Sequence, residues 1–297
     1  MKVIVLGATG MLGGMVFEYL RALQYPELRV IGTARKPTAD FFTFDVYDDP
    51  AKLRQAFDGE IDYVINCVGI TKPYCHDNNA GEVENATYIN SIFPHRLARE
   101  AQKRGFRVIQ IATDCVYSGT KGNYTEADVH DALDAYGKTK SLGEVHTPRM
   151  LHIRSSIIGP ERYHKAFLLE WFLAQPEGGK VNGFDHHRWN GITTLQFAEL
   201  CGAIVKGNNF DEIVACSNVH HFIPNNTVSK YELLCIFNTT FEKRLTVEKQ
   251  TNDQVINRTL TSRFDMLAKI YPPRSMEEAI RELKEFIIAQ HFYTIPT

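Results

Sequence analysis

The fold is decided near the N-terminus, by the stretch Lys2-Val3-Ile4-Val5-Leu6-Gly7-Ala8-Thr9-Gly10-Met11-Leu12-Gly13. Its first half is a short apolar run rich in valine and isoleucine, which is typical of a buried parallel strand. Glycines then follow with the spacing G-x-x-G-x-x-G, and apolar residues recur at helical spacing as far as Leu23. A strand, a glycine turn and a helix in this order indicate a dinucleotide-binding turn, where helix N-terminal amides face a pyrophosphate.

The next strand ends predict further contacts to a dinucleotide. Residues 29–34 form the second expected strand and lead into Arg35-Lys36, where an NAD-specific site usually has an acidic residue. Two cations suit a 2′-phosphate, so the sequence favours NADP(H) over NAD(H), although the pair also fits a solvated turn. A short strand near residues 41–45 ends in Asp45-Val46, and Asp45 suits either the adenine amine or a helix cap.

A third apolar strand, over residues 61–69, ends in Cys67-Val68-Gly69, whose small or apolar side chains would let a cofactor pass close to the backbone. A polar loop is expected over residues 71–84, followed by a long helix over 84–104. Asn90 lies on that helix among apolar neighbours. It is interpreted as a hydrogen-bonding support for the site or as a surface amide.

The candidate catalytic residues lie further along the chain. If residues 132–146 are helical, Tyr136 and Lys140 project from one face, one turn apart. An ammonium so placed is predicted to pull the tyrosine pKa below its reference value of about 10. The expected strand over 107–112 places Thr113 at its end, and ligands bind beyond the carboxyl ends of parallel strands. We therefore predict that Thr113, Tyr136 and Lys140 are catalytic and share one crevice with the glycine turn.

These motifs resemble those of the extended short-chain dehydrogenase/reductases, and they are most similar to the dTDP-4-dehydrorhamnose reductase family. The likeness lies in five segments: Gly7–Gly13, Asp45-Val46, Ala112–Gly119, Tyr136–Glu144 and Leu151–Arg154. It is close over the N-terminal half of the chain and looser beyond about Pro160.

The expected fold class is α/β: a Rossmann-type doubly wound parallel sheet with a smaller C-terminal α/β substrate lobe. The predicted NAD(P)-binding domain spans residues 1–160 and is completed by about 190–217. Residues 161–189 and 218–297 then form the substrate lobe. Helices are expected over residues 162–175, 194–205, 228–241 and 275–290.

The resemblance implies an NADPH-dependent oxidoreductase that reduces the C4 keto group of a 4-keto-6-deoxy sugar nucleotide, as in dTDP-rhamnose biosynthesis. Tyr136 would donate the proton. The predicted substrate-binding residues are Thr113, Asp114, Cys115 and Arg188, the last because a guanidinium offers paired donors to a diphosphate. The predicted cofactor-binding residues are Gly7, Thr9, Gly10, Met11, Leu12, Arg35, Lys36, Asp45, Val46, Cys67, Val68, Gly69, Asn90, Ile111, Tyr136, Lys140 and Ile157.

The triplet Thr113-Asp114-Cys115 helps to distinguish between other activities found on this fold. Similar 4,6-dehydratases carry Thr-Asp-Glu, and a thiol in apolar surroundings is a poor replacement for that carboxylate, so dehydration is disfavoured. A sugar-nucleotide 4-epimerase stays open, because it needs only the Thr, Tyr and Lys. A non-catalytic NADP-binding regulatory subunit also stays open, although the presence of all three residues favours an enzyme.

Composition excludes several classes of partner. The chain has 33 Lys and Arg residues against 35 Asp and Glu, a formal net charge of -2, so no attraction to nucleic acid or anionic lipid is expected. No signal peptide or membrane-spanning run is expected, and six cysteines without a C-x-x-C motif suggest reduced thiols in the cytoplasm. The histidine pairs at 186–187 and 220–221 lack acidic or thiol partners at ligand spacing, so no metal is predicted. A homodimer is left open.

Overall fold

The computed structural model describes residues 1–162, 165–252, 256–293 and 295. A seven-stranded sheet lies at its centre in the order β11-β6-β5-β4-β1-β2-β3, and every pair of neighbours is parallel. This confirms the predicted α/β, Rossmann-type doubly wound sheet. Its strands are β1 (Lys2–Leu6), β2 (Arg29–Ala34), β3 (Phe42–Thr43), β4 (Tyr63–Asn66), β5 (Arg107–Ala112), β6 (Met150–Arg154) and β11 (Val219–His221).

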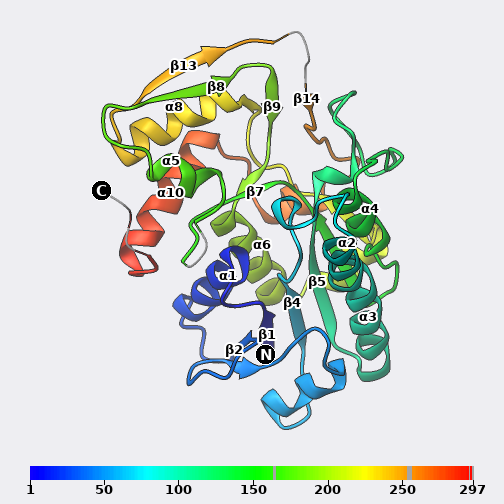
Figure 1. Cartoon of the computed structure of the whole chain (residues 1–297). Helices are drawn as coiled ribbons and strands as arrows, with labels where there is room; N and C mark the ends of the chain where they lie inside the picture. The colour runs from blue at the N-terminus through cyan, green and yellow to red at the C-terminus, as the bar shows by residue number, and fades with distance from the viewer. Residues whose placement is uncertain (163–164, 253–255, 294, 296–297) are drawn as a thin grey trace.

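Helices cover both faces of the sheet because its central strands are apolar on both sides (Figure 1). Val3 and Val5 of β1 belong to the core shared with α1 (Met11–Ala22), α6 (Thr194–Gly207) and α7 (Phe210–Cys216). Ile4 and Leu6, which alternate with them, belong to a second core with α3 (Phe93–Arg104). Alternate residues of β1 therefore face the two different layers of helices that cover the sheet.

The predicted helix over 84–104 is longer and less regular in the structure. It consists of α2 (Ala80–Thr87), a π-helical segment at Tyr88–Ile92 and then α3. The helix begins earlier than expected because the Asn79 side chain accepts a hydrogen bond from the Glu82 backbone N–H at 3.2 Å and so caps it. Short 3₁₀ helices lie at Pro50–Phe57, Lys72–Tyr74 and Asp114–Val116.

A smaller α/β region lies above the carboxyl edge of the main sheet (Figure 1). It contains three small sheets, with strand orders β12-β9-β14, β13-β8 and β10-β7. The strands are β7 (Ile157–Ile158), β8 (Lys180–Phe184), β9 (His187–Trp189), β10 (Ile192–Thr193), β12 (Val228–Ser229), β13 (Thr246–Gln250) and β14 (Ile256–Asn257). The helices are α5 (Leu168–Leu173), α8 (Lys230–Phe241), α9 (Met266–Ile270) and α10 (Met276–Ala289).

Two expectations for this region need correction, and one stays a prediction. The helix expected over 162–175 is confined to α5, because the Glu161 carboxylate accepts the Ala166 and Phe167 backbone N–H groups and holds that segment out of a helix. Residues 163–164 lie outside the described part of the chain. Strand β11 joins the main sheet just beyond residue 217, where the first domain was expected to end. The division into two domains is still a prediction.

Among the described residues, no helix is both long and apolar enough to cross a bilayer.

Candidate active site

The glycine turn between β1 and α1 has the geometry of an anion cradle. Gly7 adopts φ +76°, a conformation that favours glycine, and a Cβ on Gly13 would lie 2.2 Å from the Gly7 carbonyl oxygen. Gly10 is the N-cap of α1, where no side chain caps the helix and the first turn holds no acidic residue. The backbone N–H groups of this turn are therefore left to face an anion, which fits the pyrophosphate of a dinucleotide.

Helix α4 (Ala135–Leu142) holds the predicted catalytic pair and is shorter than the expected span of 132–146. It begins at Ala135 because the Asp134 carboxylate accepts the Gly137 N–H at 2.7 Å. A Cβ on Gly137 would lie 2.5 Å from the Cys115 carbonyl oxygen, so glycine allows α4 to pack against the segment that follows β5. Tyr136 and Lys140 are both buried on this helix.

The structure brings Thr113 and Tyr136 together. Thr113 follows β5, and its side chain lies close enough to the Tyr136 hydroxyl to act against the rise in the phenol's pKa. The Thr113 hydroxyl also lies 3.2 Å from a carboxylate oxygen of Asp114 and accepts the Cys115 N–H. Cys75 and Cys115 pack against the Tyr136 ring. A hydroxyl and a phenol thus meet in a largely apolar recess at the carboxyl edge of the sheet.

Lys140 connects this recess to the strand end predicted for the cofactor. Its ammonium donates a hydrogen bond to the Ile111 carbonyl at 3.1 Å, and a Cβ built on Gly69 would lie 3.8 Å from its nitrogen. The Asn90 side chain binds both the N–H and the C=O of Ile70, so it holds the chain next to Gly69. Asn90 is buried and hydrogen-bonded to the backbone, so it is not a surface amide.

The prediction that Lys140 lowers the pKa of Tyr136 is wrong for this structure. Burial raises the pKa of the Tyr136 phenol, and the Thr113 hydrogen bond only partly opposes that effect. Burial also lowers the pKa of Lys140 to about 8, against attraction from Glu144. Burial is the main cause of both shifts, and the Lys140 charge is not among the causes of the Tyr136 shift. Tyr136 keeps its proton throughout the neutral pH range and is available as a proton donor.

Burial also favours the uncharged forms of Asp114 and Cys115. Burial raises the pKa of the Asp114 carboxyl, partly offset by the positive charge of Arg258. Burial raises the pKa of the Cys115 thiol to about 12. No thiolate is therefore available at neutral pH beside Thr113. The thiol cannot replace the carboxylate that a dehydratase needs at this position.

The other predicted cofactor residues lie along the same edge. Val68 is adjacent to the glycine turn, since a Cβ on Gly7 would lie 3.0 Å from a Val68 methyl carbon. Arg35 and Lys36 are exposed just after β2. Asp45 does not cap the 3₁₀ helix at Pro50–Phe57, because Asp49 does so. The remaining predicted residues are Thr9 and Gly10, which are exposed, Met11, Cys67 and Ile157, which are half-buried, and Leu12 and Val46, which are buried.

Arg188 is not brought to this recess. It lies on β9, the middle strand of the sheet β12-β9-β14, beside Ser229 of β12 and Asn257 of β14. Its guanidinium is 3.7 Å from the Glu232 carboxylate. Laterally paired residues point to the same face of a sheet, and successive residues alternate. Arg258 follows Asn257 directly and therefore belongs to the opposite face. Lys230 is the first residue of α8, and the charges of Lys230 and Arg258 both lower the pKa of His187, the residue before Arg188.

The two cations near His187, Lys230 and Arg258, were missed from the sequence. Arg258 donates hydrogen bonds from Nε to the Tyr117 carbonyl at 3.0 Å and from Nη2 to the Ser118 carbonyl at 3.1 Å. Burial lowers the pKa of Lys230, and the neighbouring charge of Arg258 lowers it further. Lys230 has no hydrogen bond or ion pair to any other described residue. No sequence signal marked them, because the strands next to them are only two or three residues long.

The histidine pair His220-His221 is held by contacts to backbone carbonyls. The His220 ring lies within hydrogen-bonding distance of the Ile213 and Ser217 carbonyls, and the His221 ring binds the Thr261 carbonyl from the opposite side of β11. Within the described residues, no group of three or more His, Cys, Asp or Glu side chains is arranged to hold a metal ion.

Comparison with known families places this geometry in context. The protein-family profile described as RmlD substrate binding domain matches residues 1–272. The chain belongs to this family. The match covers the glycine turn, the segments around Thr113 and Tyr136, and most of the smaller α/β region. It confirms the resemblance to dTDP-4-dehydrorhamnose reductases that the motifs indicated.

Two curated relatives of this RmlD-family chain differ in kind. The methionine adenosyltransferase 2 subunit beta of Bos taurus is 25% identical over 248 residues, covering 81% of this chain and 72% of the relative. The spore coat polysaccharide biosynthesis protein SpsK of Bacillus subtilis is 33% identical over 146 residues, covering 48% of this chain and 47% of the relative.

Solved structures share the fold of this RmlD-family chain over almost its whole length. A dTDP-4-dehydrorhamnose reductase from Clostridium acetobutylicum superposes with a TM-score of 0.74 at 20% identity, covering 97% of this chain and 100% of that one. The reductase from Bacillus anthracis, in complex with NADP, gives 0.74 at 17% identity, covering 96% and 99%. A UDP-glucuronic acid 4-epimerase from Bacillus cereus, in complex with NAD, gives 0.71 at 17%, covering 97% and 96%.

Proposed function

We propose that this protein reduces the C4 keto group of a 4-keto-6-deoxy sugar nucleotide with NADPH. The observation that supports this most strongly is the meeting of Thr113, Tyr136 and Lys140 beside the strand ends that flank the glycine turn. A nucleotide-binding module needs the turn but not a buried hydroxyl–phenol pair. The family match adds that proteins with this fold include dTDP-4-dehydrorhamnose reductases.

The residues of the chain divide the chemistry between them. When bound, the nicotinamide supplies the hydride, because no side chain can do so. Thr113 and Tyr136 hydrogen-bond to the keto oxygen and hold it in the recess. Tyr136 then donates its proton as negative charge develops on that oxygen. Lys140 keeps the resulting phenolate stable and donates to ribose hydroxyls, and the apolar wall around Cys75 and Cys115 excludes water.

The sugar nucleotide also needs a site for its diphosphate, and we assign it to Lys230 and Arg258 in place of Arg188. Arg258 reaches Asp114 electrostatically, so it lies on the side of the recess. Its Nε and Nη2 atoms are held by carbonyls, which fixes the guanidinium plane. Lys230 is a half-buried ammonium with no carboxylate beside it among the described residues. An anion bound between them would relieve the repulsion of these two cations.

This assignment predicts how three alanine variants rank. Lys230→Ala and Arg258→Ala should each raise the KM for the sugar nucleotide about ten- to a hundredfold, the effect of losing one charge-assisted hydrogen bond of about 1.5–3 kcal/mol. Arg188→Ala, the matched control, should change it less than about twofold, since Arg188 faces Glu232. Steady-state kinetics at saturating NADPH separates the variants. If the KM rises only in Arg188→Ala, Arg188 binds the diphosphate and the assignment to Lys230 and Arg258 is wrong.

The cofactor preference rests on Arg35 and Lys36. Both are exposed after β2, in the position from which a cation reaches the ribose 2′-phosphate. Replacing both by alanine should weaken NADPH binding about ten- to a hundredfold and leave NADH binding within about twofold, because only NADPH carries the phosphate. Fluorescence titration with each cofactor measures both constants. Equal affinity of the unmodified protein for NADPH and NADH would contradict the preference.

Two alternatives are each favoured by a specific observation. The epimerase likeness includes a solved NAD complex, and epimerisation needs the same three residues. The curated match over 81% of this chain is to a protein named as a subunit of methionine adenosyltransferase, which favours a binding role. The test is NADPH absorbance decay with a panel of 4-keto sugar nucleotides. Tight NADPH binding without any turnover would support the subunit.

The cellular setting is also a proposal. Each cysteine, Cys67, Cys75, Cys115, Cys201, Cys216 and Cys235, is a free thiol in the structure. Unpaired thiols are typical of a reducing compartment, and NADPH and sugar nucleotides would be met there. We therefore propose the cytoplasm.

A further inference from the structure

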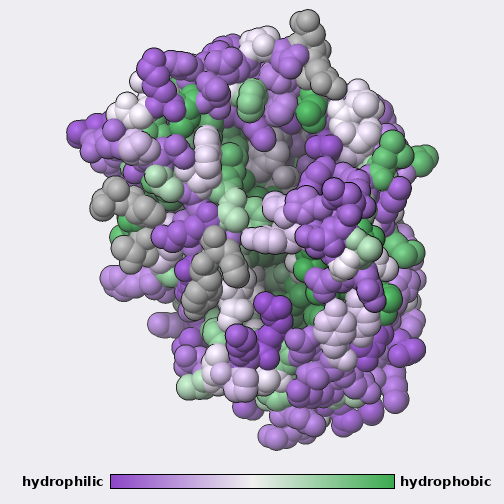
Figure 2. Space-filling model, in the orientation of Figure 1, coloured by the Kyte–Doolittle hydropathy of each residue, from purple (hydrophilic) through white to green (hydrophobic). Residues whose placement is uncertain are grey.

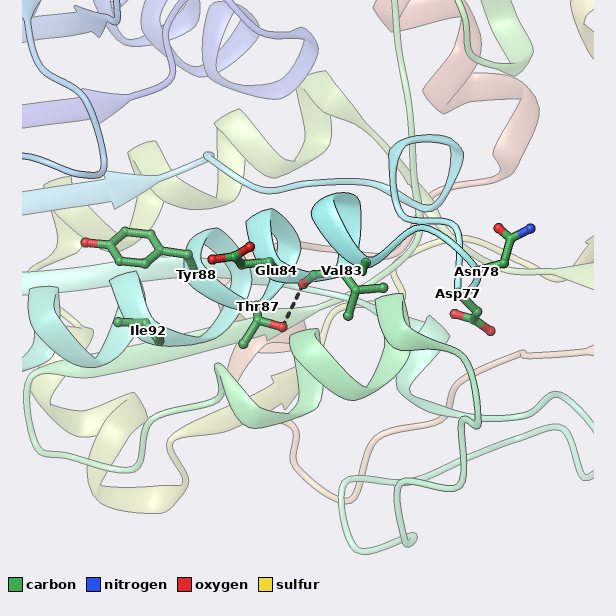
Figure 3. A pocket seen from close by; sticks show the side chains of 8 residues that line it. Asp77, Asn78, Val83, Glu84, Thr87, Tyr88 and Ile92 are labelled. Atoms are coloured by element: carbon green, nitrogen blue, oxygen red, sulfur yellow. Dashed lines mark hydrogen bonds between the residues drawn. The ribbon is translucent and has the colours of Figure 1, made fainter.

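Polar side chains are expected on the outer side of the helical layer that contains α2, α3 and α4, where water or the helix backbone satisfies them. Hydrophilic residues cover most of the visible surface (Figure 2). Figure 3 shows a shallow hollow along α2, with Asp77 and Asn78 exposed at one end. Within it, the Thr87 hydroxyl donates to the Val83 carbonyl at 2.7 Å. The inner side of this layer, against the sheet, differs, because it also contains polar side chains that the proposed chemistry does not use.

Three polar side chains form a row across the middle of the central sheet. Asn66 of β4, Gln110 of β5 and His152 of β6 are laterally paired, so they point to one face. Val108, two residues before Gln110, belongs to the core shared with α3, so this is the face that α3 covers. The three polar residues are at most 4% exposed. Their hydrogen-bond partners must therefore come from the protein.

Asn66 and Gln110 belong to one hydrogen-bond network that ends at Lys140. The Val68 backbone N–H donates to Asn66 Oδ1 at 3.1 Å, and Asn66 Nδ2 donates to Gln110 Oε1 at 2.7 Å. Gln110 Nε2 donates to the Ile111 carbonyl at 3.2 Å. The Lys140 ammonium donates to that same carbonyl at 3.1 Å. The network thus connects Val68, at the strand end beside the glycine turn, to the lysine of the recess.

The direction of this network is fixed at both ends. A backbone N–H only donates, so the Val68 N–H must meet the oxygen of the Asn66 amide. A carbonyl only accepts, so the Ile111 carbonyl must meet the nitrogen of the Gln110 amide. Turning either amide over would bring two donors or two acceptors together. Both amides are therefore held in a single orientation.

The Ile111 carbonyl is shared between an amide and an ammonium. A carbonyl oxygen has two lone pairs, and Gln110 occupies one of them, which leaves the other for Lys140. This is the one hydrogen bond that Lys140 makes to another described residue. The ammonium has three donors, so two are left for other acceptors. Because two donors compete for one oxygen, the amide limits how strongly the carbonyl holds the ammonium.

We propose that Gln110, oriented by Asn66, is a positioning residue for Lys140. By sharing the Ile111 carbonyl it keeps the ammonium from being drawn onto the strand, and so within reach of Tyr136 and the nicotinamide ribose. This inference rests on the proposed function. Replacing two paired buried amides by apolar side chains of the same shape is close to neutral for stability. Placement of the lysine therefore explains the two amides better than stability of the fold does.

The other titratable groups around Lys140 keep one charge state from neutral to moderately alkaline pH. Burial lowers the pKa of Lys140 to about 8, which Glu144 and Cys115 partly oppose. Arg154 holds the pKa of Glu144 below its ordinary value, so that carboxylate stays charged. Burial raises the pKa values of the Cys115 thiol and the Tyr136 phenol and lowers that of His152 to about 4, so these three groups stay neutral. A shift in the Lys140 titration near pH 8 therefore reports a change at the shared carbonyl.

The first test is the titration of Lys140 in Gln110→Met, which keeps the size of the side chain and removes its amide. The carbonyl then serves the ammonium alone, and a stronger hydrogen bond to the charged form raises the pKa of Lys140. The ionisation constant should fall at least about threefold. NMR of protein with ¹³C-labelled lysine measures it from the Lys140 Cε signal, assigned by its loss in Lys140→Arg. Neither substrate nor turnover is needed.

The second test is the kinetics of the same variant. The kcat for keto-sugar reduction should fall about three- to tenfold, because the ammonium is held away from the phenol whose negative charge it stabilises. The KM for the sugar nucleotide should stay within about twofold, since Gln110 lies beneath the recess and does not reach the substrate. The alkaline fall in kcat should move to higher pH together with the Lys140 titration. A purely structural role for Gln110 would not move it.

Gln196→Met is the matched control, because it makes the same change in another buried amide pair. Gln196 is 1% exposed, and its Nε2 donates to Asn225 Oδ1 at 2.7 Å. This variant should leave both the Lys140 titration and kcat within about twofold of the unmodified protein. Asn66→Ala is a second variant in case Gln110→Met does not fold. It frees the Gln110 amide to turn and should move the titration in the same direction.

Two results would overturn the proposal. One is a Lys140 titration that is unchanged in Gln110→Met and Asn66→Ala, or that moves equally in Gln196→Met. The other is an active protein in which Gln110→Met leaves kcat and its alkaline limb as they are. If the titration moves as expected but the unmodified protein oxidises no NADPH with any keto sugar, the proposed function fails and the effect of Gln110 on Lys140 is still established.

Discussion

Replacing Tyr136 by phenylalanine should lower kcat for keto-sugar reduction by about two to four orders of magnitude. The substitution removes only the hydroxyl beside Thr113, and the ring keeps its place in the apolar cluster that includes Cys75. The fold and the affinity for NADPH should therefore be unchanged. The measurement is single-turnover NADPH oxidation, with NADPH binding followed separately by fluorescence.

Tyr63→Phe is the matched control for this experiment. Tyr63 is also buried, but it lies at the start of β4, at the edge of the sheet opposite the recess. The Tyr63→Phe variant should reduce the keto sugar at the rate of the unmodified protein. If Tyr136→Phe keeps more than about a tenth of the activity, the proton comes from another group and the assignment of Tyr136 fails.

Replacing Arg154 by alanine should lower the free energy of unfolding by about 3–5 kcal/mol, the usual effect of leaving a buried charge without its partner. Arg154 is 2% exposed, and its guanidinium donates to both carboxylate oxygens of Glu144, at 3.1 and 2.6 Å. It also donates to the Tyr117 hydroxyl at 2.7 Å and lies 2.8 Å from a ring nitrogen of His221. The Arg154 side chain on β6 thus contacts β11, through His221, and the segment around Tyr117, whose carbonyl accepts a hydrogen bond from Arg258.

Urea unfolding measures this loss, and Arg281→Ala is its control. Arg281 pairs with Glu285 at 3.8 Å on the exposed side of α10, so its removal should cost less than about 0.5 kcal/mol. The pH dependence gives a second check. Burial raises the pKa of Glu144, but Arg154 reverses this and leaves the pKa below its ordinary value. The pair Glu144–Arg154 therefore stabilises the fold above the pKa that Glu144 has in the unfolded chain. This stabilisation is lost as the pH falls through the lower pKa that Glu144 has in the folded protein. Equal losses in the two variants would contradict the account.

The central sheet could be predicted from the sequence because its strands are buried on both faces. Runs such as Lys2–Leu6 and Arg107–Ala112 are continuously apolar or nearly so, and the glycine turn after Leu6 indicates that a helix comes next. The placement of Thr113 after β5 came from the same pattern. Helix limits were less accurate, because single caps such as Asp134 and Asn79 decide them.

Two features of the site could not be predicted for physical reasons. The pKa of Tyr136 depends on how deeply the phenol is buried, which spacing along a helix does not reveal. The faces to which Arg188 and Arg258 point depend on the register of short strands from distant parts of the chain, and Lys230 begins the helix that follows one of them. Strands of two or three residues carry no readable alternation. The choice of Arg188 from sequence was therefore a choice among arginines without knowledge of their faces.

Transfer of deuterium from NADPH labelled at C4 of the nicotinamide tests the central claim most directly. The recess around Thr113, Tyr136 and Lys140 is proposed to hold a keto carbon against that position. Mass spectrometry of the product should find one deuterium on the sugar, at C4, per NADPH consumed. A sugar changed at C4 without deuterium, or NADPH bound without any product, would contradict a reductase built around these three residues.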